Sequence, residues 1–255
     1  MTIHIPRKRF GQHFLVDQHY IGRIIDAIRP QPGELMVEIG PGLGALTVPL
    51  MRTLEHLHVV EIDRDIVARL AADYPADKLT IHNADALSFD FAALGSELRV
   101  VGNLPYNISS PLLFHLAEYT SHLIDLTFML QKEVVDRMVA APSTSDYGRL
   151  SVMLQAQFAM RRLFIVPPGA FKPPPKVDSA IVRMLPLPSG SPQPLDRRRF
   201  ATVVKAAFAQ RRKTLRNTLR AHLAEDDFAA LAIDPRLRAE NLSVADFIRI
   251  ADTAL

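Results

Sequence analysis

The sequence predicts an α/β protein with a mostly parallel sheet, followed by a small all-helical domain. Three observations support this prediction. Short apolar runs of strand length alternate with segments of helical spacing between residues 35 and 130. Gly40, Gly42 and Gly44 form a turn directly after the first of these runs. A proline-rich stretch at 186–194 precedes purely helical patterns. Repeated strand–helix units favour parallel strands, because each right-handed crossover uses the intervening helix.

The first half of the chain supplies most of the sheet. A helix is expected at 20–27, where isoleucines recur at helical spacing before Pro30 and Pro32. Strands are expected at 35–39, 58–62, 79–82, 98–101 and 123–130. Helices are expected between them at 45–54, 65–72 and 111–118. Since the carboxyl ends of parallel strands meet at one edge, residues that follow these strands should face a common ligand.

The second half closes the sheet and then becomes helical. Two helices and two closing strands are expected at 132–140, 149–158, 163–166 and 179–185. The prolines at 186–194 indicate a linker. Four helices are expected after it, at 197–209, 213–223, 226–233 and from 244 to the end. We therefore predict two domains, residues 1–187 and residues 188–255.

Composition excludes several classes of protein. The 255 residues include no cysteine, which excludes disulfides and thiolate nucleophiles and suits a reducing cytosol. No apolar run approaches the roughly 20 residues of a membrane helix, and the N-terminus lacks the pattern of a signal peptide. The nine histidines show no ligand-type spacing beside acids. We therefore expect a cytoplasmic protein without a membrane segment and without a metal.

Positive charge is concentrated near the C-terminal end. From Gly190 onward there are 12 Lys+Arg and 8 Asp+Glu, a net charge of +4, whereas the earlier part carries −1. A basic domain beside a nearly neutral one indicates a polyanionic partner such as nucleic acid. An ordinary solvated basic surface is the alternative interpretation.

The residues after the first three strands indicate a nucleotide-like cofactor. Glycines at 40 and 42 allow positive φ and close approach of a ligand. Their spacing differs from the G-x-G-x-x-G of dinucleotide enzymes. Glu61, at the end of the next strand, can accept both ribose hydroxyls, and Asp85 can accept hydrogen bonds from an adenine amino group. Each acid taken alone could be a surface carboxylate, but three such features at consecutive strand ends favour an adenosine-containing cofactor.

Asn103-Leu104-Pro105-Tyr106 follows the fourth strand and indicates the reaction. An exocyclic amino group of a base is a poor nucleophile, because its lone pair is delocalised into the ring. The Asn103 side-chain oxygen and the Leu104 carbonyl could accept its two N–H groups and direct the lone pair at a methyl group. Pro105 stiffens the backbone, and Tyr106 offers a ring on which a flipped base can stack. The alternative is an ordinary turn with a buried tyrosine.

These motifs resemble the adenine-N6 methyltransferases that use S-adenosylmethionine. More narrowly, Arg9-Phe-Gly-Gln-His-Phe-Leu15, Phe171-Lys-Pro-Pro-Pro-Lys-Val-Asp-Ser179 and Phe208-Ala-Gln-Arg-Arg-Lys-Thr-Leu-Arg-Asn217 resemble the bacterial small-subunit ribosomal RNA adenine dimethyltransferases. The resemblance runs from about Arg7 to the C-terminus. It implies a seven-stranded Rossmann-like methyltransferase domain and a small helical domain. It also implies dimethylation of two adjacent adenosines in a hairpin near the 3′ end of 16S rRNA, late in subunit assembly.

The resemblance also implies site residues. The cofactor residues are expected to be His13, Leu15, Gly40, Gly42, Glu61, Ile62, Asp85, Ala86 and Asn103. His13 stands where the family often has asparagine, although histidine can also donate or accept a hydrogen bond. Phe171 falls where the family places a ring near the target base, which would suit stacking opposite Tyr106.

Basic residues near both ends are the expected RNA contacts. Arg212, Arg216 and Arg220 recur every four residues and would share one face of the helix predicted at 213–223, whereas Leu215, Leu219 and Leu223 would share another. The expected RNA-binding residues are Arg7, Lys8, Arg9, Lys205, Arg211, Arg212, Lys213, Arg216 and Arg220. The ribosomal partner would be 16S rRNA within the small subunit, bound by a monomer.

Three other functions fit part of the sequence. A macrolide-resistance methyltransferase shares the chemistry of residues 103–106 but acts on large-subunit RNA. A nicotinamide dehydrogenase would share the glycine turn and Glu61, but gives no reason for Asn103-Leu-Pro-Tyr106. A non-catalytic assembly factor could keep the fold, although the complete set of cofactor positions argues against it.

Overall fold

The structure, a computed structural model, describes residues 13–254. The chain divides into two compact units. Unit 1 comprises the residues up to Val135 together with Met160–Pro186, and unit 2 comprises Asp136–Ala159 together with the residues from Leu187. Among the described residues, no helix combines the length and the apolar character that a membrane span requires.

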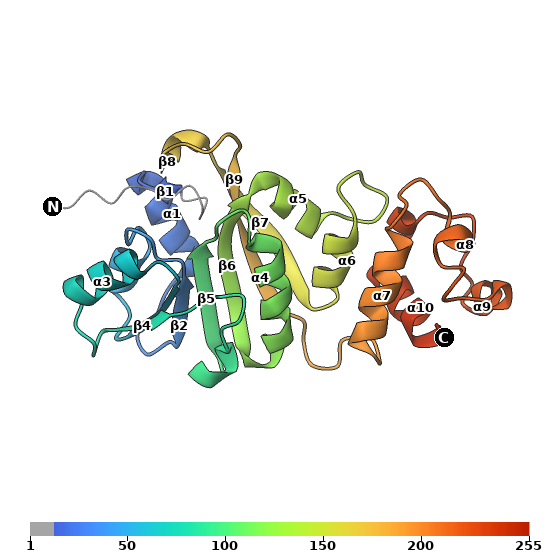
Figure 1. The fold of residues 1–255 in the computed structure, drawn as a ribbon, viewed down its shortest axis with the longest axis horizontal. Helices are drawn as coiled ribbons and strands as arrows, with labels where there is room; N and C mark the ends of the chain where they lie inside the picture. Colours follow the sequence, from blue (N-terminus) through green and yellow to red (C-terminus); the bar gives the residue numbers. More distant parts are fainter. Residues whose placement is uncertain (1–12, 255) are drawn as a thin grey trace. The chain divides into compact units, whose positions relative to one another are not determined.

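Unit 1 is built on a seven-stranded sheet with the order β4-β3-β2-β5-β6-β9-β7 (Figure 1). Neighbouring strands from β4 to β6 are parallel, and β9 pairs antiparallel with β6. This confirms the predicted, mostly parallel sheet. The strands are β2 (Met36–Ile39), β3 (Leu57–Glu61), β4 (Leu79–Asn83), β5 (Leu98–Asn103), β6 (Leu123–Gln131), β7 (Phe158–Val166) and β9 (Ser179–Pro186).

The strand order reverses between β2 and β5, because the chain first adds β3 and β4 on one side of β2 and then adds β5 on the other. In open α/β sheets such a switch point leaves a crevice at the carboxyl ends of the strands. The glycine turn follows β2 and Asn103 ends β5. The topology therefore places the two segments that the sequence singled out beside the same crevice.

Aspartate side chains cap the first turns of two helices of unit 1. The Asp17 side chain accepts the N–H groups of His19 and Tyr20 at 2.9 and 3.4 Å, and the Asp63 side chain accepts that of Asp65 at 3.0 Å. Such caps satisfy N–H groups that have no partner within the helix. The helical segments are α1 (Gln18–Ile28), α2 (Thr47–Leu50), α3 (Arg64–Asp73), η2 (Phe91–Leu94), α4 (Ser109–Leu116), η3 (Ala117–His122) and η4 (Pro168–Ala170).

A two-stranded ribbon precedes α1 in the chain and was not predicted from the sequence. It pairs β1 (Phe14–Leu15) antiparallel with β8 (Phe171–Lys172). The backbone N–H groups of Val16 and Asp17 extend this pairing by donating to the Ala170 carbonyl. The ribbon thus ties the start of the described chain to the proline-rich bend before β9.

Unit 2 is helical and has its own apolar core. Its helix α6 packs against α7, and α7 packs against α10 (Figure 1). Phe200, Val204, Phe247 and Ile250 are buried in this core. The segments are α6 (Arg149–Gln155), α7 (Arg197–Ala207), α8 (Leu215–Thr218), α9 (Glu225–Ala230), η5 (Ala239–Asn241) and α10 (Val244–Thr253). The boundary between the units falls inside α5 (Lys132–Val139).

The predicted boundary after residue 187 misses one segment of the helical unit. Asp136–Ala159 belongs to unit 2, because Tyr147, Val152 and Ala156 are buried in the same core as α7 and α10. A chain cut after residue 187 would therefore leave an apolar face of α6 uncovered. Substitutions in the intact chain are a cleaner test of what this unit binds.

Two predicted helices are much shorter than expected. The helix predicted at 45–54 is reduced to α2, with turns on both sides. The helix predicted at 213–223 is reduced to α8. The N–H groups of Leu215 and Arg216 donate to carbonyls of Leu237 and Pro235, at 2.8 and 3.0 Å, which fixes the start of this helix. Leu219 follows in a turn, so the predicted common face for three arginines does not form.

Three histidines lie together at the β3–β4 side of the sheet. The His58 Nδ1 and His82 Nε2 atoms are 3.1 Å apart, and the ring of His56 lies edge-on to that of His58, with centroids 4.9 Å apart. Both ring nitrogens of His56 are engaged, by the Asp77 carbonyl and the Thr80 hydroxyl. Burial and the neighbouring histidines lower the pKa of His58 to about 4, and burial also lowers that of His82. His58 and His82 are therefore neutral in the folded protein at pH 7.

This cluster predicts a loss of stability in weak acid. The unfolded chain takes up protons near pH 6.5, whereas folded His58 resists protonation until about pH 4. The stability that neutral His58 contributes to the folded protein is fully present above pH 6.5 and is lost as the pH falls toward 4. Because His58 is partly exposed, we expect a loss of only about 1 kcal/mol between pH 6.5 and 5. Urea unfolding of wild type and His58→Asn at both pH values tests this. An equal loss in the variant would contradict it, since the acidic residues titrate in both proteins.

Candidate active site

A cavity of about 350 Å³ opens at the carboxyl ends of β2, β3, β4 and β5. Its volume lies within the range of small-molecule sites. Every cofactor residue expected from the sequence lines it: His13, Leu15, Gly40, Gly42, Glu61, Ile62, Asp85, Ala86 and Asn103. Leu104, Pro105 and Tyr106 line it too. The residues that follow the first four predicted strands therefore lie around one cavity.

The glycine turn forms one wall of the cavity. Gly40 has φ +68° and Gly42 has φ +54°. Residues other than glycine rarely adopt this backbone conformation. A Cβ built on Gly42 would lie 3.3 Å from the ring of Phe14, so the ribbon strand β1 lies directly against this turn. The Gly40 N–H donates to the Val60 carbonyl at 3.0 Å, which fixes the turn to β3.

Glu61 lies at the end of β3, where it is almost fully buried. One oxygen of its carboxylate accepts the Asp63 N–H at 2.8 Å. Burial raises the pKa of Glu61, while the backbone N–H groups of Asp63, Gly42 and Ile62 lower it. Asp85, after β4, is exposed, and its side chain accepts the Leu87 N–H at 2.9 Å. Glu61 is therefore a fixed acceptor inside the cavity, and Asp85 is a more open one.

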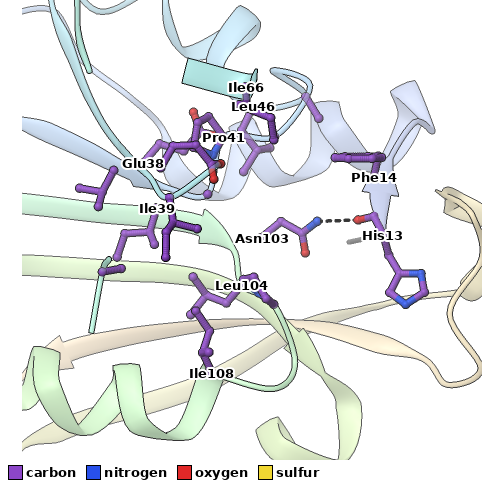
Figure 2. Close-up of a pocket in the computed structure, with 18 of the residues that line it drawn as sticks. His13, Phe14, Glu38, Ile39, Pro41, Leu46, Ile66, Asn103, Leu104 and Ile108 are labelled. Atoms are coloured by element: carbon purple, nitrogen blue, oxygen red, sulfur yellow. Dashed lines mark hydrogen bonds between the residues drawn. The ribbon is translucent and has the colours of Figure 1, made fainter. Parts of the chain in front are cut away.

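Glu38 is a cavity residue that the sequence did not single out. It lies on the central strand β2, is 1% exposed, and accepts a hydrogen bond from the Thr47 hydroxyl at 2.7 Å. Burial raises the pKa of Glu38 to about 7, and the nearby charge of Glu61 adds to the shift. The sequence feature that could have indicated Glu38 is its position as an acidic residue inside the apolar run before the glycine turn. Figure 2 shows Glu38 beside Pro41 and Leu46 at this wall.

Asn103 is held by the N-terminal ribbon. Its Nδ2 atom donates to the His13 carbonyl oxygen at 3.1 Å, drawn as the dashed line in Figure 2. Because only the amide NH₂ can donate to a carbonyl, this bond fixes which way the side chain is turned. The amide oxygen then points away from His13 and stays available as an acceptor (Figure 2). The preceding Gly102 permits close packing, since a Cβ there would lie 2.5 Å from the Ile39 carbonyl oxygen.

The turn that follows Asn103 is fixed at several points. The Leu104 N–H donates to the Met129 carbonyl at 3.1 Å. The Tyr106 hydroxyl is 2.7 Å from the Ser179 hydroxyl, and the Tyr106 ring stacks on that of His13 with centroids 5.8 Å apart. Burial raises the pKa of Tyr106, so its hydroxyl keeps its proton at neutral pH. The ring is a neutral aromatic surface at the edge of the cavity.

Phe171 is buried, and its expected place beside the target base stays a prediction. It is 4% exposed and packs in the core of unit 1, whose members include Leu15. The antiparallel pairing of β1 with β8 places Phe171 opposite Leu15 and accounts for this burial. Phe171 is not among the residues that line the cavity. The ring that faces Tyr106 in the structure is that of His13.

The expected RNA-binding residues separate into three groups. Arg7, Lys8 and Arg9 lie outside the described residues. Arg211 pairs with Glu240 at 3.3 Å and donates to the Ser145 carbonyl, and Arg216 pairs with Glu225. The side chains that are exposed and form no ion pair within residues 13–254 are Lys205, Arg212, Lys213 and Arg220.

Within residues 13–254, no group of three or more acidic or histidine side chains is arranged to hold a metal.

Together these features describe a place for a nucleoside. The glycine turn admits a ligand close to the backbone, Glu61 supplies a buried acceptor for hydroxyls, and the apolar side chains of Leu46, Ile62 and Ile66 can enclose a base. The fold and this cavity define a class I methyltransferase, whose cofactor is S-adenosylmethionine. The residues present fit that cofactor.

Comparison with known proteins gives the family. Residues 3–254 match the family model described as ribosomal RNA adenine dimethylase, and the chain belongs to that family. A curated relative from Aromatoleum aromaticum, named ribosomal RNA small subunit methyltransferase A, is 65% identical over 99% of this chain and 95% of its own length. A relative of the same name from Nitrosospira multiformis is 62% identical over 98% and 96%.

Solved structures agree with this assignment. A dimethyladenosine transferase from Plasmodium falciparum superposes with a TM-score of 0.80 at 25% identity, covering 93% of this chain and 96% of its own. The 23S rRNA methyltransferase ErmE has a TM-score of 0.71 at 24% identity, covering 94% and 98%, and supports the fold alone. Membership of this family rules out the nicotinamide dehydrogenase.

Proposed function

We propose that this enzyme dimethylates the N6 atoms of two adjacent adenosines in the hairpin loop near the 3′ end of 16S rRNA, during late assembly of the small subunit. The observation that carries the proposal is the orientation of Asn103, whose amide is turned so that its oxygen remains an acceptor at the cavity. The small-subunit substrate is supported by the names of relatives that are 55–65% identical. A monomer acting in the cytoplasm stays a prediction.

The chemistry follows from how the turn presents its acceptors. Bound S-adenosylmethionine supplies an electrophilic methyl group. Before the first transfer, Asn103 Oδ1 and the Leu104 carbonyl accept the two N6–H groups and draw the lone pair of that nitrogen out of the adenine ring. The nitrogen loses one proton as it gains the methyl group, so a single N6–H remains to be accepted before the second transfer. Tyr106 holds the flipped base by stacking. Because each acceptor is fixed before the substrate arrives, little reorganisation is needed during transfer.

Unit 2 is proposed to bind the RNA backbone. Lys205, Arg212, Lys213 and Arg220 are exposed and free of ion pairs among the described residues, so they can neutralise phosphates without first breaking a bond to a carboxylate. Neutralising phosphates releases counterions and makes binding sensitive to salt. Arg211 and Arg216 are already engaged, and we assign them a smaller part in RNA binding than the sequence suggested.

Methyl transfer to purified subunits tests the proposal. Small and large subunits from cells lacking these modifications are incubated with the enzyme and radiolabelled S-adenosylmethionine, and the labelled fragment is mapped. We expect label in the 3′-end hairpin of small-subunit RNA. Label in large-subunit RNA would overturn the substrate assignment in favour of a resistance-type enzyme. Tight binding without label would indicate a non-catalytic assembly factor.

Neighbouring arginines offer a matched test of the RNA surface. We expect Arg212→Ala to weaken RNA binding and to reduce the slope of log K against log salt by about 0.7–0.9, the value for one lost phosphate contact. We expect Arg211→Ala to change the slope less, because Arg211 is held by Glu240 and the Ser145 carbonyl. Filter binding from 50 to 300 mM salt measures both slopes. A larger effect for Arg211→Ala would contradict the assignment.

A further inference from the structure

Two buried serines hydrogen-bond to Tyr106, one at its backbone carbonyl and the other at its side-chain hydroxyl. Ser109, 2% exposed at the start of α4, donates its hydroxyl to the Tyr106 carbonyl oxygen at 3.1 Å. Ser179, fully buried at the start of β9, lies with its hydroxyl 2.7 Å from the Tyr106 hydroxyl. The first bond closes the turn. The second reaches across from a strand 73 residues away and meets the far end of the ring.

The second bond has a geometric consequence. A tyrosine on a turn can rotate about two side-chain torsions, and its ring plane is fixed only when both are restrained. Its hydroxyl lies on the ring axis, so a partner there restrains the direction in which the ring points. The partner is itself fixed, because Ser179 pairs with Gln131 in the sheet and the neighbouring Asp178 carbonyl accepts the Lys132 N–H at 2.9 Å. The contact of Tyr106 with the His13 ring then restrains rotation about the axis.

We infer that Ser179 is a positioning residue for methyl transfer: it anchors the Tyr106 hydroxyl and thereby holds the ring where the target adenine must stack. This inference rests on the proposed role of Tyr106 as the stacking surface. The serine touches neither cofactor nor base. Its effect is to keep the flipped base, and with it the N6 atom, in register with the Asn103 and Leu104 acceptors.

A double-mutant cycle tests this. Ser179→Ala and Tyr106→Phe each remove one partner of the same hydrogen bond, and both retain an aromatic ring at residue 106. We expect each to lower the single-turnover rate about 3- to 10-fold, with the Kd for S-adenosylmethionine unchanged within twofold. The double variant should be no slower than either single variant. Ser151→Ala removes an equally buried hydroxyl in unit 2, which donates to the Arg137 carbonyl, and should keep the wild-type rate.

Fluorescence separates positioning from a general loss of stability. An RNA hairpin with 2-aminopurine at the target adenosine reports stacking by quenching, and the chain has no tryptophan to interfere. We expect brighter emission from the Ser179→Ala complex than from wild type. A wild-type rate in Ser179→Ala, multiplied losses in the double variant, or an equal loss in Ser151→Ala would overturn the inference. A wild-type rate in Tyr106→Ala would instead remove the stacking role itself, and the inference with it.

Discussion

Replacing Asn103 with alanine is expected to lower kcat about 100- to 1,000-fold, the cost typical of removing one preorganised hydrogen-bonding group from an active site. The amide oxygen would no longer accept an N6–H group, so the amino lone pair would remain delocalised in the base. The Kd for S-adenosylmethionine should change only a few-fold, because Glu61 and the glycine turn remain. Single-turnover transfer and calorimetric titration with the cofactor measure the two quantities separately.

Asn107→Ala is the matched comparison. Asn107 lies on the same turn and lines the same cavity, but it is exposed and has no bond to the N-terminal ribbon. We expect its effect on kcat to be less than tenfold. Asn103→Ala could instead retain wild-type turnover, or it could weaken only the binding of the cofactor. Either result would show that Asn103 does not accept an N6–H group of the target adenine.

Replacing Glu61 with glutamine is expected to weaken cofactor binding about 10- to 100-fold, with kcat at saturating cofactor nearly unchanged. The range is that of one or two hydrogen bonds to a charged group. Glutamine keeps an oxygen for the Asp63 N–H but replaces the other acceptor by an NH₂ group, which cannot accept a ribose hydroxyl. Glu61→Ala should weaken binding further, because it also leaves that N–H without its partner.

The pH dependence of binding supplies the control for Glu61. Burial raises the pKa of its carboxyl, and the ionised form is the better acceptor. Wild-type affinity should therefore fall as the pH drops through this raised pKa, and the fall should be smaller in Glu61→Gln. Glu38 has a pKa of about 7 that the charge of Glu61 helps to raise, so both proteins are compared in a Glu38→Gln background. Identical pH profiles would show that Glu61 does not bind the cofactor as a carboxylate.

The sequence predicted the cavity well because strand ends are fixed by short-range patterns. Apolar runs, the glycine turn and the residues after each run are all local features, and a parallel sheet brings their carboxyl ends together without further information. Glu61, Asp85 and Asn103 were placed correctly for this reason. Glu38 was missed because a buried acid interrupts an apolar strand and gives no periodic signal.

The errors concern contacts between distant parts of the chain. Helical periodicity marks which face of α6 is apolar but not what covers it, so its place in unit 2 could not be predicted. Phe171 is an aromatic residue of the kind that can stack on a base. Its burial follows from the pairing of its strand with Leu15, 156 residues earlier. The arginine stripe failed because Leu215 and Arg216 donate to carbonyls more than 15 residues away. Residue spacing alone carries none of this information.

The identity of the methylated nucleoside tests the central claim most directly. After reaction with unmodified small subunits, the 3′-end hairpin is isolated, digested to nucleosides and analysed by mass spectrometry against standards. The proposed function predicts N6,N6-dimethyladenosine at two adjacent positions. Methylation at a ring nitrogen, a ring carbon or a ribose hydroxyl would contradict the account, since Asn103 and Leu104 would then not be directing the exocyclic amine.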